Sequence, residues 1–580
     1  MTNLRIMAAV AVAATLVTGL AACGGSGASS GSGEQFNAAV ATVHRPSDAK
    51  GGVIRMANPG DWDSLDPAES YYSYEWDFAR LFGRSLLTFA PAPGKDGTKL
   101  VPDLATGMGT ASDGDKTWTY HIRTGVKFED GTTVTTKDVK YAVERSLDKT
   151  VFPDGPTYFN DYLDLKGYTS PYKDPSPDKL GLSAIETPDD TTIVFHLSRA
   201  FAGFDYFAML PSTMPVERSK DSGSDYKKHV VSSGPYMFGT NTLGKGFTLV
   251  RNPHWDPKTD PVRKALPNEF DVSLNVNADD IDQRLIAGDL DFEITGNGLQ
   301  AAAQGKVVAD QRLKANADNP SSARLWYTAI NGDVAPLDNV HCRQAVEYAA
   351  DRKSYQAAYG GSLGGDVASN LLPPVIPGAK AFNPYPSPDN TGDQAKAKQE
   401  LQACGKPDGF TTTISYRAER PKEKNVAEAL QQSLSKVGIQ LTIKPFPQND
   451  YGKLYAGKPD YAKNNNLGLI VYGWQADWPE GFGFLSQIVD SRVIRASGGN
   501  SNFGVKDPAV DALLDQATTT EDTAGREKLY DQIDQKVMAD AYILPGVVAK
   551  ALLYRPSKVT NLFVSDGYGM YDYAAVGVQQ

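Results

Sequence analysis

Residues 467–472 read Leu-Gly-Leu-Ile-Val-Tyr, an apolar run without a charged side chain. Such a run is typical of a strand that helices bury on both faces, as in a parallel sheet. Before it, residues 426–437 carry apolar side chains at helical spacing, Gly438 follows as a stop signal, and residues 439–443 alternate as a strand. The second half of the chain is therefore predicted to be α/β with parallel strands.

The segment directly after this strand is the first candidate for a ligand site. Residues 473–477 read Gly-Trp-Gln-Ala-Asp. In open α/β sheets, ligands bind beyond the carboxyl ends of the strands. The pattern therefore directs attention to Trp474 and Asp477.

The first half of the chain contains shorter strands. Residues 52–57 are predicted to form a buried strand, and residues 117–123 and 192–197 alternate between apolar and polar side chains. The last two segments could share an antiparallel sheet. Residues 150–180 are rich in Pro, Tyr and Asp and are predicted to be loop.

Composition limits the classes of protein that the chain can represent. Its 580 residues are 41% hydrophobic and 22% charged, which is ordinary for a globular protein of two or three lobes. The net charge of −11 opposes binding to nucleic acid. Six His and three Cys offer little material for a metal cluster, so we expect neither a metal nor a cofactor.

The N-terminus is predicted to be an export signal with a lipid attachment site. Residues 6–20 are apolar and uncharged, too few for the roughly 20 that span a membrane but suitable for a signal peptide. Residues 20–23, Leu-Ala-Ala-Cys, resemble a bacterial lipobox. We expect a signal peptide at 1–22, a lipidated Cys23 and a flexible tether over 23–50, which places the protein outside the cytoplasm on the cell membrane. The alternative is an ordinary signal peptide with a chance cysteine.

The two remaining cysteines, Cys342 and Cys404, are expected to form a disulfide, because an even pair outside the cytoplasm usually does. The alternative is two separately buried thiols.

The sequence offers no catalytic arrangement. The string G-x-S-x-G at 27–31 lies in the tether, without a strand and helix around it. Residues 239–246 approach a P-loop but lack the Ser or Thr that would hold magnesium, so a hairpin turn fits better. We therefore expect a protein that is not an enzyme; an extracytoplasmic hydrolase would require a nucleophile and base that the sequence does not display.

Several blocks together resemble a known family. Residues 101–105, 118–123, 125–132 and 137–145 are similar to the family 5 solute-binding proteins of ABC importers, the oligopeptide and dipeptide binders. Further blocks follow in the family's order from Gly51 onward. They are residues 51–55 with 65–67, 233–236, 251–255, 284–291, 343–345 with 351–352, and 473–477.

The resemblance implies the type II periplasmic-binding-protein fold, with two α/β lobes, a hinge and an extra domain. By analogy, the first lobe would be discontinuous, over residues 50–92, 225–323 and 551–580. The extra domain would be 93–224, and the second lobe 324–550. A ligand would be captured between the lobes, which would close over it by hinge motion.

The resemblance also implies a function and partners. The chain would be a monomeric, lipid-anchored binding protein that delivers peptides to an ABC permease and its ATPase. Asp477 would hold the ligand's α-ammonium group; the alternative is that it only caps a turn. The other candidate ligand-binding residues are Trp474, Trp478, Gly499, Asn500, Ser233, Gly234 and Tyr72.

This chain departs from the family pattern at the carboxylate end of the ligand. The oligopeptide binders carry a basic residue on the strand before the Gly-Trp block, whereas residues 469–472 contain none. Arg417, Arg420 and Lys422 lie nearby in sequence, but the sequence does not place them in the cleft. Other ligands of the same fold class, namely nickel chelates, haem and oligosaccharides, and a role as a peptide-signal receptor remain open.

Overall fold

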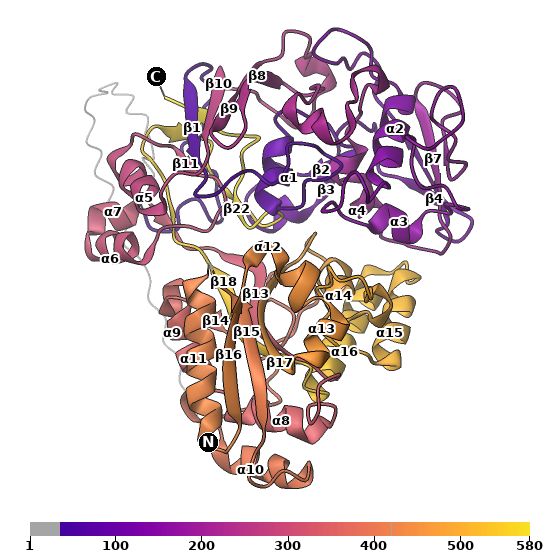
Figure 1. Ribbon diagram of the computed structural model, residues 1–580. Coiled ribbons are helices and arrows are strands. Elements are labelled where there is room, and N and C mark those ends of the chain that lie inside the picture. Colours follow the sequence, from indigo (N-terminus) through magenta and orange to yellow (C-terminus); the bar gives the residue numbers. More distant parts are fainter. Residues whose placement is uncertain (1–34, 419, 580) are drawn as a thin grey trace, which may run out of the picture.

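The computed structural model describes residues 35–418 and 420–579 (Figure 1). The predicted signal peptide, Cys23 and the first part of the tether lie outside these residues. Within the described ranges, no helix is both long and apolar enough to cross a membrane. Figure 1 shows an upper part, formed by residues 35–320 and 551–579, above a lower part formed by residues 321–550.

The upper part contains a five-stranded sheet with the order β11-β1-β10-β9-β8. Its strands are β1 (Val53–Ala57), β8 (Tyr236–Thr242), β9 (Gly246–Arg251), β10 (Glu269–Ser273) and β11 (Phe292–Glu293). β1 runs parallel to both neighbours, and β8 and β9 form an antiparallel pair. This pair confirms the hairpin that was predicted in place of a P-loop. The helices α1 (Ser73–Ala79), α5 (Ala278–Ala287), α6 (Ala301–Ala309) and α7 (Gln311–Ala315) belong to the same part.

The predicted extra domain contains a second, four-stranded sheet with the order β4-β5-β7-β6. Its strands are β4 (Thr110–Ser112), β5 (Thr117–His121), β6 (Ile185–Glu186) and β7 (Thr192–His196). β5 and β7 form an antiparallel pair, as expected for the two alternating segments, and Trp118 lies opposite Phe195 in it. Between them, α2 (Thr136–Ser146) begins with a capping box in which Thr135 is the N-cap and Asp138 its partner.

The loop prediction for residues 150–180 is wrong in one place. The short helix α3 (Tyr158–Tyr162) forms there and packs near α4 (Asp205–Ala208) through contacts between Tyr158 and Phe207. Tertiary packing of aromatic rings stabilises a helix that the Pro-rich and Asp-rich composition did not predict.

The lower part is built on a six-stranded sheet with the order β14-β18-β13-β17-β15-β16. Its strands are β13 (Ser321–Ile330), β14 (Gly365–Val367), β15 (Thr411–Arg417), β16 (Gln440–Phe446), β17 (Leu467–Gln475) and β18 (Ile543–Lys550). β15 is parallel to β16 and β17, but β13 is antiparallel to β17 and β18. The predicted parallel sheet is therefore a mixed one, because an apolar run marks burial on both faces and carries no information about strand direction.

Helices cover both faces of this sheet (Figure 1). Two groups of helices cover the two faces. Leu469 and Val471 of β17 share a buried cluster with the first group of helices, and Ile470 shares another buried cluster with the second group. The first group is α8 (Val340–Ala349), α9 (Arg352–Ala358), α10 (Gln394–Ala403) and α11 (Pro421–Ser435). The second is α14 (Gly481–Val489), α15 (Pro508–Thr518) and α16 (Thr523–Ala539).

The chain passes between the two parts twice. β12 (Ala317–Asp318) pairs with β19 (Leu553–Tyr554) in the upper part, and the neighbouring β13 and β18 pair in the lower sheet. Two adjacent crossings of this kind agree with a discontinuous first lobe; the precise domain boundaries remain a prediction.

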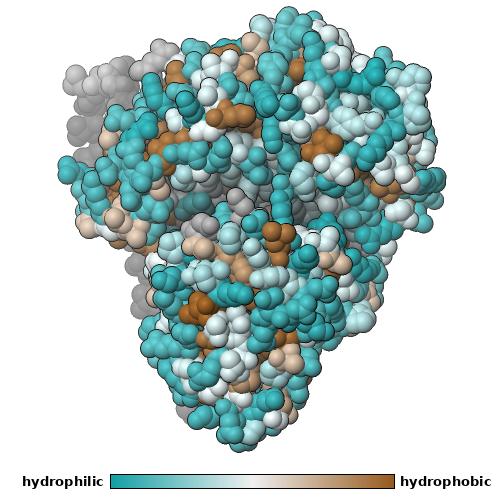
Figure 2. All heavy atoms as spheres, in the orientation of Figure 1, coloured by the Kyte–Doolittle hydropathy of each residue, from teal (hydrophilic) through white to brown (hydrophobic). Residues whose placement is uncertain are grey.

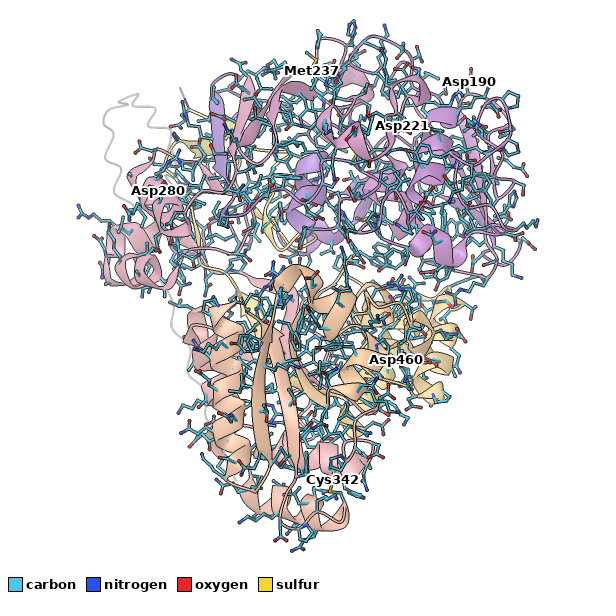
Figure 3. All side chains as sticks on the ribbon, in the orientation of Figure 1. Asp190, Asp221, Met237, Asp280, Cys342 and Asp460 are labelled. Atoms are coloured by element: carbon cyan, nitrogen blue, oxygen red, sulfur yellow. A yellow bond between two sulfur atoms is a disulfide. The ribbon has the colours of Figure 1, made fainter. Side chains whose placement is uncertain are left out.

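A disulfide joins Cys342 on α8 to Cys404 at the end of α10, with the Cα atoms 5.4 Å apart. Figure 3 places Cys342 at the end of the lower part that is remote from the upper part.

Candidate functional site

One carboxylate lies where three parts of the molecule meet. Asp477 follows β17 by two residues, and its backbone N–H donates to the carbonyl oxygen of Gly483 at the start of α14. Its side chain accepts a hydrogen bond of 3.0 Å from the Tyr71 hydroxyl, which comes from the loop before α1. It accepts another from the hydroxyl of Tyr158 at the start of α3. The predicted first lobe, the predicted extra domain and the predicted second lobe thus converge on Asp477.

The electrostatic environment of Asp477 is unusual for a carboxylate. Burial raises its pKa to about 7, although the hydrogen bonds from Tyr158 and Tyr71 act in the opposite direction. No cationic side chain of residues 35–418 or 420–579 contributes to this pKa. Asp477 is half-buried. A partly desolvated carboxylate that has hydroxyl donors but no cation is well suited to accept an ammonium group, because a charge-assisted hydrogen bond would compensate its desolvation.

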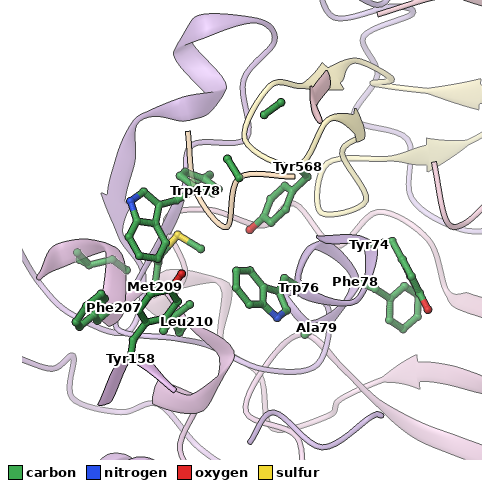
Figure 4. Close-up of a cluster of buried hydrophobic side chains, with 14 of the residues drawn as sticks. Tyr74, Trp76, Phe78, Ala79, Tyr158, Phe207, Met209, Leu210, Trp478 and Tyr568 are labelled. Atoms are coloured by element: carbon green, nitrogen blue, oxygen red, sulfur yellow. The ribbon is translucent and has the colours of Figure 1, made fainter. Parts of the chain in front are cut away.

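Trp478 was predicted to contact the ligand, but its side chain is fully buried, with 0% of its surface exposed. It packs against Tyr158 and Phe207 at ring-centroid distances of 4.9 and 5.9 Å and stacks on Tyr206 at 5.4 Å (Figure 4). The indole therefore joins the second lobe to the extra domain and leaves the ligand no ring surface. The sequence pattern did not distinguish a tryptophan that packs inside the protein from one that contacts a ligand.

Trp474 is half-buried on β17. Its indole Nε1 has no hydrogen-bond partner among the residues that the structure describes. An unused donor of this kind on the strand that leads to Asp477 is compatible with the predicted place in the cleft wall.

The loop at Gly499 and Asn500 uses its polar groups internally. The Asn500 amide donates to the carbonyl oxygens of Gly457 and Arg495, at 2.8 and 2.7 Å. The Gly499 backbone N–H donates to the carbonyl oxygen of Gly452. The Asn500 amide and the Gly499 N–H already have acceptors within the protein, so they do not match the prediction that this loop offers free amide groups to a ligand.

Ser233 and Gly234 are buried beside the end of α1. Both backbone N–H groups donate to the carbonyl oxygen of Phe82, at 2.9 Å. A Cβ atom at position 234 would lie only 2.8 Å from the carbonyl oxygen of Leu81. This close approach explains the glycine as a packing requirement, and the predicted contact of Ser233 and Gly234 with a ligand stays a prediction.

Tyr72 lies in the loop before α1, and 48% of its surface is exposed. Its ring stacks on Tyr74 at a centroid distance of 5.7 Å. Burial and the carboxylate of Asp63 raise its pKa, while Arg420 of the second lobe opposes this. Tyr72 therefore lies close to charges of both the upper and the lower part, and its contact with a ligand stays a prediction.

Arginines gather at the same end of the lower sheet as Asp477. Arg417 ends β15 and pairs with Glu423 at 2.9 Å, and Arg420 donates to the Gln448 side chain at 2.7 Å. Arg324 on β13 lies opposite Gln475 of β17, and no pattern in the sequence predicted it for the site. Lys422 is exposed. The sequence also missed Tyr158, because it lies in the segment predicted to be loop.

Comparisons with known proteins identify the family. A sequence model described as bacterial extracellular solute-binding proteins, family 5 Middle, matches residues 99–494, which is more than half of the chain. The chain belongs to family 5 of the bacterial extracellular solute-binding proteins. Its solved relatives share the type II periplasmic-binding fold, which confirms the predicted fold class.

The relatives of this family 5 protein are named for different ligands. It is 27% identical to the probable D,D-dipeptide-binding periplasmic protein DdpA of Escherichia coli (strain K12), over 84% of this chain and 87% of the relative. It is 28% identical to heme-binding protein A of Haemophilus influenzae (strain ATCC 51907 / DSM 11121 / KW20 / Rd), over 83% and 85%.

A solved structure is more similar. Clavulanic acid biosynthesis oligopeptide binding protein 2 is 41% identical, with a TM-score of 0.91, over 94% of this chain and 99% of that one. The family assignment makes this chain a solute-binding protein of the ABC-transporter type.

Proposed function

We propose that this family 5 protein captures peptides by their free amino terminus, with Asp477 as the anchor of the α-ammonium group. The arrangement at Asp477 carries the proposal: a carboxylate at a three-way domain junction accepts two tyrosine hydroxyls, and no cation among the described residues pairs with it. A peptide ammonium would provide the missing charge. The names of the dipeptide-binding and oligopeptide-binding relatives support the same ligand class.

The function needs no chemical step. Closure of the lobes over the ligand would bring Tyr71 and Tyr158 to the carboxylate from two directions, and the closed form would be the one that docks on the ABC permease. The lipobox-like residues 20–23 support anchoring through Cys23, which would keep the protein near its transporter. A Cys23→Ser variant should then be lost from the membrane fraction.

A thermal-shift screen of the purified protein, stripped of bound ligand, tests the ligand class. Peptide pools of two to eight residues, haem and oligosaccharides would be compared. A ligand at 100 times its Kd adds about 2.7 kcal/mol to the free energy of unfolding, which shifts the melting temperature measurably. A shift with peptides alone supports the proposal, and a shift with haem or sugars alone contradicts it.

A further inference from the structure

Residues 35–47 lie within the predicted tether, but they pack on the upper part; we refer to this segment as the strap. Ala39, near its start, is buried, with 0% of its surface exposed. The Ala39 N–H donates to the Asp318 side chain at 3.0 Å, and the Ala39 carbonyl oxygen accepts from the N–H of Val564 at 2.7 Å. Farther along, His44 forms an antiparallel bridge with Leu562. The strap is therefore part of the folded body, which the prediction of a flexible tether over 23–50 did not anticipate.

The first residues of the strap reach the place where the chain crosses between the two parts. One crossing runs from β12 to β13 through residues 319–320, and the other runs from β18 to β19 through residues 551–552. The Asn319 N–H donates to the Asn37 side chain at 2.8 Å, and the Asn37 N–H donates to the carbonyl oxygen of Ala317 at 2.9 Å. The strap is thus bonded directly to the first crossing.

The strap is also connected to the second crossing. With its nitrogen toward these acceptors, the Asn319 side-chain amide donates to the carbonyl oxygens of Ala551 and Leu363, at 3.3 and 3.2 Å. Ala551 belongs to the second crossing, and Leu363 lies just before β14 in the lower part. Phe36 of the strap packs against the buried cluster that contains Leu552. Both crossings are therefore linked to the strap, one directly and the other through Asn319 and this cluster.

A buried carboxylate at the first crossing takes one of its hydrogen bonds from the strap. Asp318 ends β12 and is 0% exposed. It accepts from the Ala39 N–H and, at 2.7 Å, from the Tyr571 hydroxyl, and it pairs with Arg555. Arg555 in turn donates to the carbonyl oxygen of Gln35 at 2.8 Å. Because a buried charged group is destabilised when it loses a hydrogen bond, the position of the strap and the geometry of the crossing are coupled.

The structure shows the hinge in a closed conformation, in which the two parts touch. Besides the two tyrosine hydrogen bonds to Asp477, Lys453 of the lower part pairs with Asp154 of the upper part at 2.8 Å. Opening of the lobes would change the backbone at the two crossings, where the strap is bonded or linked. Contacts that are made in one of two conformations shift the equilibrium toward that conformation. The contacts of the strap therefore favour closure.

We propose that the strap holds the hinge in the closed conformation and thereby sets the affinity of the cleft for its ligand. The inference rests on capture of a ligand between the lobes, and it requires neither a peptide as that ligand nor Asp477 as its anchor. Apparent affinity is the intrinsic affinity multiplied by the fraction of molecules in the competent conformation, so a strap that favours closure strengthens binding. Asn37 and Ala39 are positioning residues in this account, because they act through the hinge.

The test compares strap variants of the purified protein. Ala39→Glu places a charge at a buried position and should displace the strap, whereas Ala39→Ser is the conservative variant that should keep it in place. Thr42→Glu is the matched control, because Thr42 is exposed on the same segment and its hydroxyl donates within the strap, to the carbonyl oxygen of Ala38. Asn37→Gly removes the side-chain acceptor of the Asn319 N–H and tolerates the φ of 64° at this position.

Two quantities are measured for each variant. Calorimetry gives the Kd for tri-alanine. Small-angle X-ray scattering of the ligand-free protein gives the radius of gyration, which increases when the lobes open. Melting temperatures verify that each variant folds.

The expected result separates the variants by their contact with the hinge. Ala39→Glu should raise the Kd for tri-alanine by about fivefold or more and increase the radius of gyration of the ligand-free protein. Asn37→Gly should raise the Kd by roughly twofold to threefold. Ala39→Ser and Thr42→Glu should behave like the wild type in both measurements.

Two results overturn the inference. One is an unchanged Kd and radius of gyration in a folded Ala39→Glu protein, even with a lower melting temperature, because the strap would then support the fold without acting on the hinge. The other is an equal loss of affinity in Thr42→Glu, which would assign the effect to added charge. If Ala39→Glu does not fold, Asn37→Gly decides by the same criteria.

Failure of the proposed function is distinguishable from failure of this inference. If tri-alanine and the other peptides do not bind the wild type, the proposed function is wrong. The scattering of the ligand-free variants still decides whether the strap acts on the hinge.

Discussion

The hydroxyl of Tyr158 donates a hydrogen bond to the carboxylate of Asp477, two residues that are 319 positions apart in the chain. Tyr158 begins α3 in the extra domain, whereas Asp477 follows β17 in the second lobe. Tyr71 reaches the same carboxylate from the first lobe. A change in the charge of Asp477 would therefore alter the strength of both hydrogen bonds and with it the contacts between the three parts of the molecule. This links the proposed ligand contact to the closure of the lobes.

Tyr158→Phe should weaken peptide binding. The hydroxyl stabilises the ionised form of Asp477, and hydrogen bonds to charged groups contribute about 1.5–3 kcal/mol. We expect the pKa of Asp477 to rise further and the Kd for tri-alanine at pH 7 to increase about tenfold or more. Calorimetry measures this change. Tyr206→Phe is the matched control, because Tyr206 stacks on Trp478 but does not donate to Asp477; an equal loss in both variants would contradict the account.

Peptide affinity should depend on pH through Asp477. Its pKa is raised to about 7 in the free protein, and only the carboxylate form attracts an ammonium group. Affinity should therefore rise as pH increases toward 7, by up to tenfold per pH unit, and fall again as the peptide amine, with a pKa of about 8, loses its proton. Binding isotherms from pH 5 to 9 test this. A profile that is flat between pH 5 and 7 would speak against Asp477 as the anchor.

The same pKa predicts an effect on stability in the absence of ligand. Because the folded-state pKa of Asp477 lies above its unfolded value, the protonated form is favoured by folding, and this contribution is lost as pH rises through about 7. Asp477→Asn keeps a neutral side chain at every pH. We expect this variant to melt at a higher temperature than the wild type at pH 8 but at nearly the same temperature at pH 4. An Asp477→Asn variant whose melting temperature falls equally at pH 4 and pH 8 would contradict a raised pKa of Asp477 in the folded protein.

Trp478→Ala should affect folding and binding together. The indole is fully buried between Tyr158, Tyr206 and Phe207, and removal of a buried tryptophan costs about 3–5 kcal/mol. Its neighbour Asp477 would also lose its fixed position. Trp478→Phe retains ring packing and should be milder in both respects. Chemical denaturation and calorimetry measure the two effects, and unchanged affinity in a folded Trp478→Ala protein would show that the packing does not position Asp477.

Loss of the disulfide should affect stability alone. Cys342 and Cys404 close a segment with a sequence separation of 62 residues, for which chain entropy gives about 4 kcal/mol. The bond lies at the end of the lower part that is remote from the upper part and from the proposed site at Asp477, which hydrogen-bonds to the upper part (Figure 3). A variant with both cysteines changed to serine should therefore unfold at lower denaturant concentration but bind tri-alanine with an unchanged Kd. Its insensitivity to reductant provides the control.

The sequence predicted the fold better than the site. The apolar run before Asp477, the helix ended by Gly438 and the alternation in residues 117–123 and 192–197 are local patterns, and the structure contains the strands and the helix that they predict. The direction of β13 was not predictable, because apolar composition does not encode strand polarity. Tyr158 was missed because aromatic packing between distant segments creates α3. Arg324 was missed because only its register with Gln475 brings it to the edge of the sheet.

The face of the molecule shown in Figure 2 is mostly hydrophilic, and it is hollowed between the upper and lower parts. The hydrogen bonds from Tyr71 and Tyr158 to Asp477 connect these two parts. The proposed ligand would thus bridge the same two parts that the tyrosine hydrogen bonds already connect.

The most direct measurement is a calorimetric comparison of tri-alanine with N-acetyl-tri-alanine, on the wild type and on Asp477→Asn at pH 7. Acetylation should weaken binding to the wild type at least a hundredfold, because it removes the ammonium group that would pair with the Asp477 carboxylate. The Asp477→Asn variant should bind both peptides with similarly low affinity. Equal affinity of the wild type for the two peptides would contradict the central claim that Asp477 anchors the amino terminus.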